Sequence, residues 1–176
     1  DGIIQLSNSG EFLGYYTSNK VNLTFIQMLQ DFFFTEAQQA NLFARTPSTF
    51  SNLFTDRNGI LYTSTIGGGY EAVKKHNTAG QNMLNPSIPV SSMLDIYVDQ
   101  AGIIYGATSD GYIYVYSAEG EFIYLFGADA DNMDVAGLFG DLRSIAVDST
   151  GEIWALDREK GMLQSFKPTE YSSRVY

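Results

Sequence analysis

The sequence has 176 residues and a net charge of −10, and no Lys or Arg lies between Lys75 and Arg143. Such a chain repels nucleic acid and anionic membrane surfaces, because both are bound mainly through cationic side chains. No apolar run is long enough to span a membrane, and the lack of cysteine excludes disulfides and thiol chemistry. The composition therefore predicts neither a nucleic-acid-binding protein nor a membrane-inserted one.

Short strands separated by polar turns are predicted along most of the chain. Each central strand alternates apolar with polar residues or is continuously apolar, and is rich in β-branched and aromatic residues, as expected where sheets pack face to face. Gly10, Gly80 and Gly120 supply the positive φ angle that a tight hairpin needs. The predicted strands are 3–7, 11–16, 51–55, 60–65, 70–76, 81–84, 94–98, 102–107, 112–117, 121–126, 143–147, 152–156 and 162–167.

One segment, residues 22–44, breaks the strand pattern. Phe25 and Phe32 belong to an apolar stripe with helical spacing, and Thr35 with Gln38 forms a capping box that opens a second short helix through Phe43, so the insert is predicted to be a helical hairpin. We expect a short helical insert whose apolar face packs against one end of the sheets. Its high Phe content leaves a second interpretation open, a docking face for a partner.

A turn motif followed by an aromatic-ended strand occurs three times, and about 45 residues separate successive copies. Such a period, with four strands in each unit, indicates an all-β fold of the β-propeller type. A propeller has one active centre but needs a closed turn in each blade, so we interpret the recurrent Asp as a turn-closing side chain that accepts backbone N–H groups. The copies read Asp56-Arg-Asn-Gly59-Ile-Leu-Tyr62, Asp99-Gln-Ala-Gly102-Ile-Ile-Tyr105 and Asp148-Ser-Thr-Gly151-Glu-Ile-Trp154.

These copies resemble NHL repeats, whose pattern runs Asp-x-x-Gly-x-Ile followed by Tyr or Trp. The resemblance implies a six-bladed propeller, of which residues 1–176 would supply about three and a half four-stranded blades with the helical insert. The chain departs from the family where Lys160 and Met162 replace the Asn and Arg of a turn. A narrower similarity, to bacterial extracytoplasmic NHL-repeat proteins of uncharacterised function, rests on Gly10-Glu-Phe-Leu-Gly, Asn19-Lys-Val, Pro47-Ser-Thr-Phe-Ser-Asn-Leu and Asp56-Arg-Asn-Gly-Ile-Leu-Tyr-Thr.

The start of the chain aligns with the later strands of a repeat. Ile3-Ile4-Gln5-Leu6 matches Ile113-Tyr114-Val115-Tyr116, which is the third strand of its unit, so we expect the chain to be a segment of a longer protein. Fewer than about four twisted sheets cannot enclose a packed axis. The segment should therefore be part of a larger propeller or one half of a ring completed in a dimer.

The loops near 65–70, 107–111 and 157–161 should emerge on one rim of the propeller. Aromatic and polar groups on the loops of a rigid scaffold suit recognition of a glycan or a protein. An inert loop is the alternative for each residue. The candidate ligand-binding residues are Tyr70, Ser109, Asp110, Asp157, Arg158 and Lys160.

Two further patterns concern metals. Asp129, Asp131 and Asp134 lie in the loop before the last predicted sheet, where oxygen ligands could hold calcium, although their spacing departs from an EF-type loop and favours a solvated loop. His76 is the only histidine and follows two lysines at the end of a strand. It is predicted to face solvent rather than to bind a metal.

The sequence favours a non-catalytic recognition or scaffold module, outside the cytoplasm or at the cell surface, that binds a protein or a glycan. No catalytic residue and, apart from the calcium considered above, no cofactor is predicted, because the only His is isolated and Cys is absent. The inner-strand positions around Leu53, Ile96 and Ile145 are apolar, which argues against an enzyme without excluding a contribution from other blades. Two alternatives stay open. One is a lactonase-like metal-dependent hydrolase whose site lies partly in blades outside this chain, and the other is a structural spacer of a surface assembly.

Overall fold

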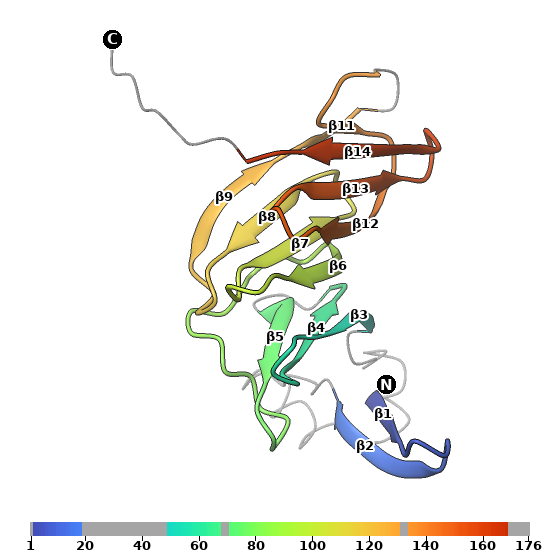
Figure 1. Ribbon diagram of the computed structural model, residues 1–176, viewed down its shortest axis with the longest axis vertical. Helices are drawn as coiled ribbons and strands as arrows, with labels where there is room; N and C mark the ends of the chain where they lie inside the picture. Colours follow the sequence, from blue (N-terminus) through green and yellow to red (C-terminus); the bar gives the residue numbers. More distant parts are fainter. Residues whose placement is uncertain (1, 19–48, 68–70, 131–133, 169–176) are drawn as a thin grey trace, which may run out of the picture. The chain divides into compact units, whose positions relative to one another are not determined.

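The computed structural model divides the chain into two compact units, Asp1–Thr49 and Phe50–Tyr176. The described part of each unit is built from strands (Figure 1), and none of it forms a helix that could cross a membrane. The helical insert predicted for 22–44 lies outside the described residues. The described residues are 2–18, 49–67, 71–130 and 134–168.

The described residues of the first unit form an antiparallel hairpin of β1 (Gly2–Leu6) and β2 (Phe12–Ser18). The hydroxyl of Ser7 closes its turn by accepting the backbone N–H of Glu11 at 3.0 Å. Gly10 has a φ of 83°, which an L-residue with a side chain rarely adopts. The two strands predicted at the start of the chain are therefore present.

The described part of the second unit contains three antiparallel sheets, and the strands of each sheet follow one another in sequence order (Figure 1). The first sheet contains β3 (Phe50–Thr55), β4 (Leu61–Thr65) and β5 (Val73–His76). The second sheet contains β6 (Met93–Val98), β7 (Ile104–Thr108), β8 (Ile113–Tyr116) and β9 (Phe122–Phe126). A parallel pair, β10 (Ala128–Asp129) with β11 (Leu138–Phe139), precedes the third sheet of β12 (Leu142–Val147), β13 (Ile153–Asp157) and β14 (Met162–Phe166).

One predicted strand of the first sheet, 81–84, does not form. Only an isolated bridge joins His76 to Asn82 at this place. The side-chain oxygen of Asn82 accepts the backbone N–H groups of Lys75 and Leu84, each at 3.1 Å. A side chain thus takes over the N–H of Lys75 that a fourth strand would bond, while the carbonyl of Lys75 still accepts the N–H of Met83 at 2.7 Å.

Each Asp of the recurrent motif closes the turn between the first two strands of its sheet. In the second sheet, Oδ1 of Asp99 accepts the N–H groups of Ala101 and Ile103 at 2.8 and 2.9 Å. Asp56 and Asp148 make the equivalent pairs of bonds, and the glycine of each copy has a positive φ. The predicted turn-closing role is confirmed.

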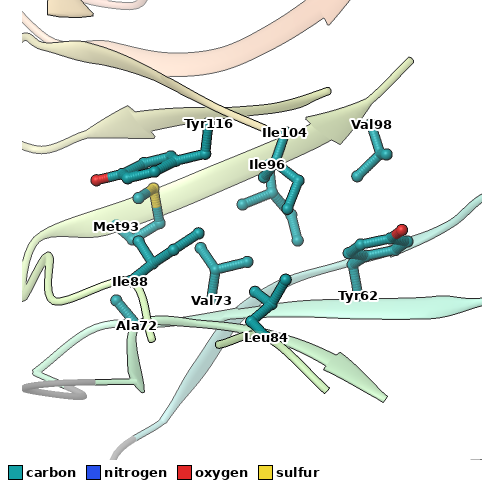
Figure 2. Close-up of a cluster of buried hydrophobic side chains, with 10 residues drawn as sticks. All are labelled: Tyr62, Ala72, Val73, Leu84, Ile88, Met93, Ile96, Val98, Ile104 and Tyr116. Atoms are coloured by element: carbon teal, nitrogen blue, oxygen red, sulfur yellow. The ribbon is translucent and has the colours of Figure 1, made fainter. Parts of the chain in front are cut away.

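A buried apolar cluster joins the first and second sheets (Figure 2). Tyr62 of β4 and Val73 of β5 contribute from one side, and Ile96 of β6 and Ile104 of β7 contribute from the other. These four side chains are at most 2% exposed. Burial of apolar surface stabilises a fold by about 25 cal/mol per Å², so this interface holds the two sheets together.

A second cluster joins the second and third sheets through the equivalent strand positions. Tyr105 of β7 takes the place of Tyr62, and Ile153 of β13 takes the place of Ile104. Each sheet thus has a forward face, which carries Tyr62 or its equivalent, and a back face, which carries Ile104 or its equivalent. In both interfaces the forward face of one sheet packs on the back face of the next.

Polar residues on the first strands of the three sheets form a hydrogen-bonded chain, here called the axial chain. The carboxylate of Asp95 on β6 is 5% exposed, and each of its oxygens accepts two hydrogen bonds. Oδ1 accepts the side-chain N–H of Asn52 on β3 and the backbone N–H of Ile96. Oδ2 accepts the hydroxyl of Ser144 on β12 at 2.6 Å and the N–H of Ile145 at 2.8 Å. One buried carboxylate therefore joins all three sheets.

Candidate functional site

The candidate site lies along one edge of the second unit, here called the loop edge. Strand pairing places the ends of β4, β7 and β13 beside the starts of β3, β6 and β12, and the contacts of Asp95 align these first strands. Neighbouring loops are joined by backbone hydrogen bonds, from Gly67 to Ser91 at 2.7 Å and from Ser109, which is exposed, to Ser92 at 2.9 Å. Loops from all three sheets therefore share this edge.

Asp110 is exposed in the loop between β7 and β8. The hydroxyl of Ser92 donates to Oδ1 of Asp110 at 2.9 Å. Burial alone would raise the pKa of Asp110, but hydrogen bonds from Thr108 and Ser92 bring it below its ordinary value. The half-buried rings of Tyr112 and Tyr114 follow in edge-to-face contact, with centroids 6.4 Å apart. An ionised carboxylate near aromatic rings can accept hydrogen bonds from ligand hydroxyls.

Asp157, at the end of β13, is fully buried. Its Oδ2 accepts the N–H of Gly140 at 2.7 Å, and its Oδ1 accepts those of Lys160 and Asp141 at 3.1 and 3.2 Å. Burial alone would raise the pKa of Asp157, but these N–H groups bring it below its ordinary value. The carboxylate thus holds the β13–β14 loop to the segment before β12, and its oxygens are already engaged.

Arg158 and Arg143 converge on one carboxylate at the loop edge. The Nε atom of Arg158 lies 2.6 Å from Oδ2 of Asp141, and that of Arg143 lies 2.7 Å from Oδ1. The side chains of Arg158 and Arg143 are 67% and 40% exposed, whereas that of Asp141 is 20% exposed. Nearby, Nζ of Lys160 donates to the carbonyl of Leu138 at 3.3 Å. Two exposed guanidinium groups are therefore held in place by a shared partner.

The remaining predicted site residues are spread outside this group. Tyr70 and Asp131 lie outside the described residues. Asp129 of β10 and Asp134 are exposed. Within the described part of the chain, no group of three or more His, Cys, Asp or Glu side chains could hold a metal ion. The calcium site stays a prediction.

The prediction that His76 faces solvent is wrong, because its side chain is 3% exposed. Nε2 lies 2.8 Å from the hydroxyl of Thr63, and Nδ1 lies 3.2 Å from the carbonyl of Gly80. A carbonyl only accepts hydrogen bonds, so Nδ1 is assigned the proton and Nε2 accepts from Thr63. Burial lowers the pKa of His76 and outweighs the bond to Gly80, which favours the neutral ring. The arrangement suits a structural residue.

The axial chain was not predicted from the sequence, because the adjacent positions taken for the inner strands, Leu53 and Ile145 among them, are apolar. In β3, β6 and β12 a register shift lies directly before the polar residue, and such a shift re-aims the side chains that follow it. The available signal was a polar residue at the third position of every first strand. These residues are Asn52, Asp95 and Ser144.

No family model and no curated protein matches this sequence. Among solved structures, a protein of unknown function from Bacteroides caccae aligns with a TM-score of 0.50 and 9% identity, over 92% of this chain and 52% of its own. The computationally designed Ika8 protein has a TM-score of 0.46 and 14% identity, with 69% and 33% of the two chains covered. An extracellular domain from B. thetaiotaomicron has a TM-score of 0.39 and 16% identity, with 65% and 18% covered. The chain spans about half or less of each, and the likeness concerns the fold alone.

Proposed function

We propose that the chain is part of an NHL-type β-propeller that acts as a non-catalytic recognition module, binding a glycan or a protein through its loop edge. A location outside the cytoplasm belongs to the proposal. It agrees with the acidic composition, in which 12 Tyr and 17 Gly accompany a net charge of −10.

The repeated packing of the sheets supports the propeller. On the forward face of the third sheet, the paired residues Leu156 and Leu163 are 45% and 60% exposed, whereas Ala107 and Ile113 at the equivalent positions of the second sheet are fully buried. A propeller would cover this face with a further sheet, from a longer chain or from a second copy.

Light scattering tests this architecture. A monodisperse dimer would favour completion by pairing, and aggregation that Leu163→Glu suppresses would favour an open arc with an uncovered face. A stable monomer whose molecular mass in light scattering is the same with and without Leu163→Glu would contradict the propeller.

The recognition proposal depends on one observation, that the loop edge carries exposed charged groups already held in place. Ser92 orients Asp110, and Asp141 orients Arg158. Side chains that are ordered before binding lose less conformational entropy when a ligand arrives. At the opposite edge of the sheets, by contrast, the recurrent Asp residues are occupied by their own turns.

A glycan array, together with a pull-down of protein partners, tests this function. Asp110→Ala or Arg158→Ala should remove the binding, while Arg57→Ala, in a turn at the opposite edge, should not. Thermal unfolding curves that match those of the parent chain would show that the variants fold. Binding that survives both loop-edge changes would contradict the site, and metal-dependent turnover of a lactone would support a hydrolase instead.

A further inference from the structure

We propose that Arg143 and Arg158, held by Asp141, form a binding site for a single carboxylate group of an acidic sugar. The inference deepens the recognition function proposed above and rests on it for the use of the loop edge.

Each guanidinium group keeps hydrogen-bonding capacity after it has paired with Asp141. A guanidinium carries five N–H donors, and here Nε is the atom that lies closest to the carboxylate. The edge formed by the two terminal nitrogens is suited to a second, bidentate acceptor. Among the described residues, Asp141 is the only carboxylate paired with Arg143 or Arg158.

The backbone fixes the two arginines relative to each other. The N–H of Arg158 donates to the carbonyl of Asp141 at 2.9 Å, so the two loops are joined by main-chain as well as side-chain contacts. Asp157 adds bonds to the N–H groups of Gly140 and Asp141. The site is therefore assembled before any ligand arrives, which favours binding.

The charges around the two arginines leave room for one anion. Asp141 neutralises the charge of one guanidinium group. Lys160 helps to lower the pKa of Asp157, so the charges of Lys160 and Asp157 offset each other. Glu159, whose side chain lies near Gly140, is the acidic neighbour that competes with a bound anion for the arginines, but it is exposed to solvent. More distant charges of the chain are screened by salt over about 8 Å.

A carboxylate suits this site better than a phosphate. A phosphate places about two charges on one group, where the balance above leaves room for one, whereas each carboxylate of a sugar acid carries one charge and two planar oxygens that match a guanidinium edge. A sugar is the favoured source, because Ser92 and Asp110 can exchange hydrogen bonds with hydroxyl groups. The loop of Asp110 is continuous with the site: Gly111 lies against the backbone of Ala128 on β10, and β10 pairs with β11, which leads into Asp141.

Isothermal titration calorimetry of the whole chain with trigalacturonate tests the proposal, and the methyl ester of the same trisaccharide is the neutral control. Arg143→Ala and Arg158→Ala should each weaken binding about tenfold or more, as should esterification. Arg158→Lys should restore only part of the loss, because an ammonium lacks the planar fork. Glu159→Gln should tighten binding, and Arg57→Ala should leave it unchanged.

Equal binding of acid and ester, an equal loss in Arg57→Ala, or no binding of trigalacturonate at about 10 mM would overturn this site. A neutral glycan that binds through Asp110 but not through the arginines would leave the recognition function standing and refute this inference alone. Hexaglutamate that binds through both arginines where trigalacturonate does not would refute the sugar as the source of the carboxylate. The ester control does not depend on the folding of any variant.

Discussion

Replacing Asp95 with Asn tests whether the axial chain holds the three sheets together. The two side chains have nearly the same size, so the change creates no cavity. The carboxylate accepts hydrogen bonds from the backbone of Ile96 and Ile145 and from the side chains of Asn52 and Ser144. An amide has only one acceptor oxygen, so its NH₂ group must face one pair of these donors.

The expected loss of stability follows from that mismatch. The side chains of Asn52 and Ser144 can turn to offer an acceptor, but the backbone cannot, so the N–H of either Ile96 or Ile145 loses its partner. An unsatisfied buried donor costs about 1–3 kcal/mol, and a hydrogen bond to a charged group is worth about 1.5–3 kcal/mol. We expect Asp95→Asn to lower the free energy of unfolding by about 3 kcal/mol.

Urea unfolding followed by the fluorescence of Trp154, the single Trp, measures this change within the second unit. Asp99→Asn is the matched control. One oxygen of Asp99 accepts both turn N–H groups, and its other oxygen accepts the rotatable hydroxyl of Tyr105. The amide oxygen of Asn77 accepts both N–H groups of an equivalent turn, so an Asn can do the same at position 99. The control should lose less than about 1 kcal/mol. Equal losses, within about 0.5 kcal/mol, would refute the role assigned to Asp95.

Three further outcomes are expected. Gly151→Ala should lower the free energy of unfolding by about 1–2 kcal/mol, measured by thermal unfolding, because the φ of Gly151 is 83°. Gly120→Ala should lower it more, since the φ of Gly120 is 96° and a Cβ there would also lie 2.7 Å from the carbonyl oxygen of Pro86. A smaller loss for Gly120→Ala than for Gly151→Ala would contradict this. The pKa of His76 is below its ordinary 6.5 in the folded state, so the unfolded chain takes up the proton first and the free energy of unfolding should fall as pH drops below 6.5. His76→Gln should remove that dependence, and a slope that persists would rule out His76 as its source. Asp157→Ala should speed amide hydrogen exchange in the loops it joins, and unchanged exchange there would argue against its structural role.

The strands and turns could be predicted from the sequence because their determinants are local. Asp99 bonds to N–H groups two and four residues further along, and Gly102 between them supplies the positive φ. Alternation along each strand decides which side chains share a face, so the motif also predicted the repeated packing of the sheets. The prediction failed at 81–84, where the side chain of Asn82 competes with the ladder.

Only the tertiary structure decided which polar residues meet and which are buried. Asp95 bonds to side chains 43 and 49 residues away, and the carboxylate of Asp157 reaches N–H groups on a segment that precedes β12. Whether a strand face is covered depends on the sheet beside it, so the residues around His76 contain no sign of its burial. The sequence alone thus determined the turns, the strands and the candidate polar residues. Packing between distant segments then buried Asp157 beside its N–H donors and left Arg158 exposed. A buried charge needs such partners, and only the fold can supply them.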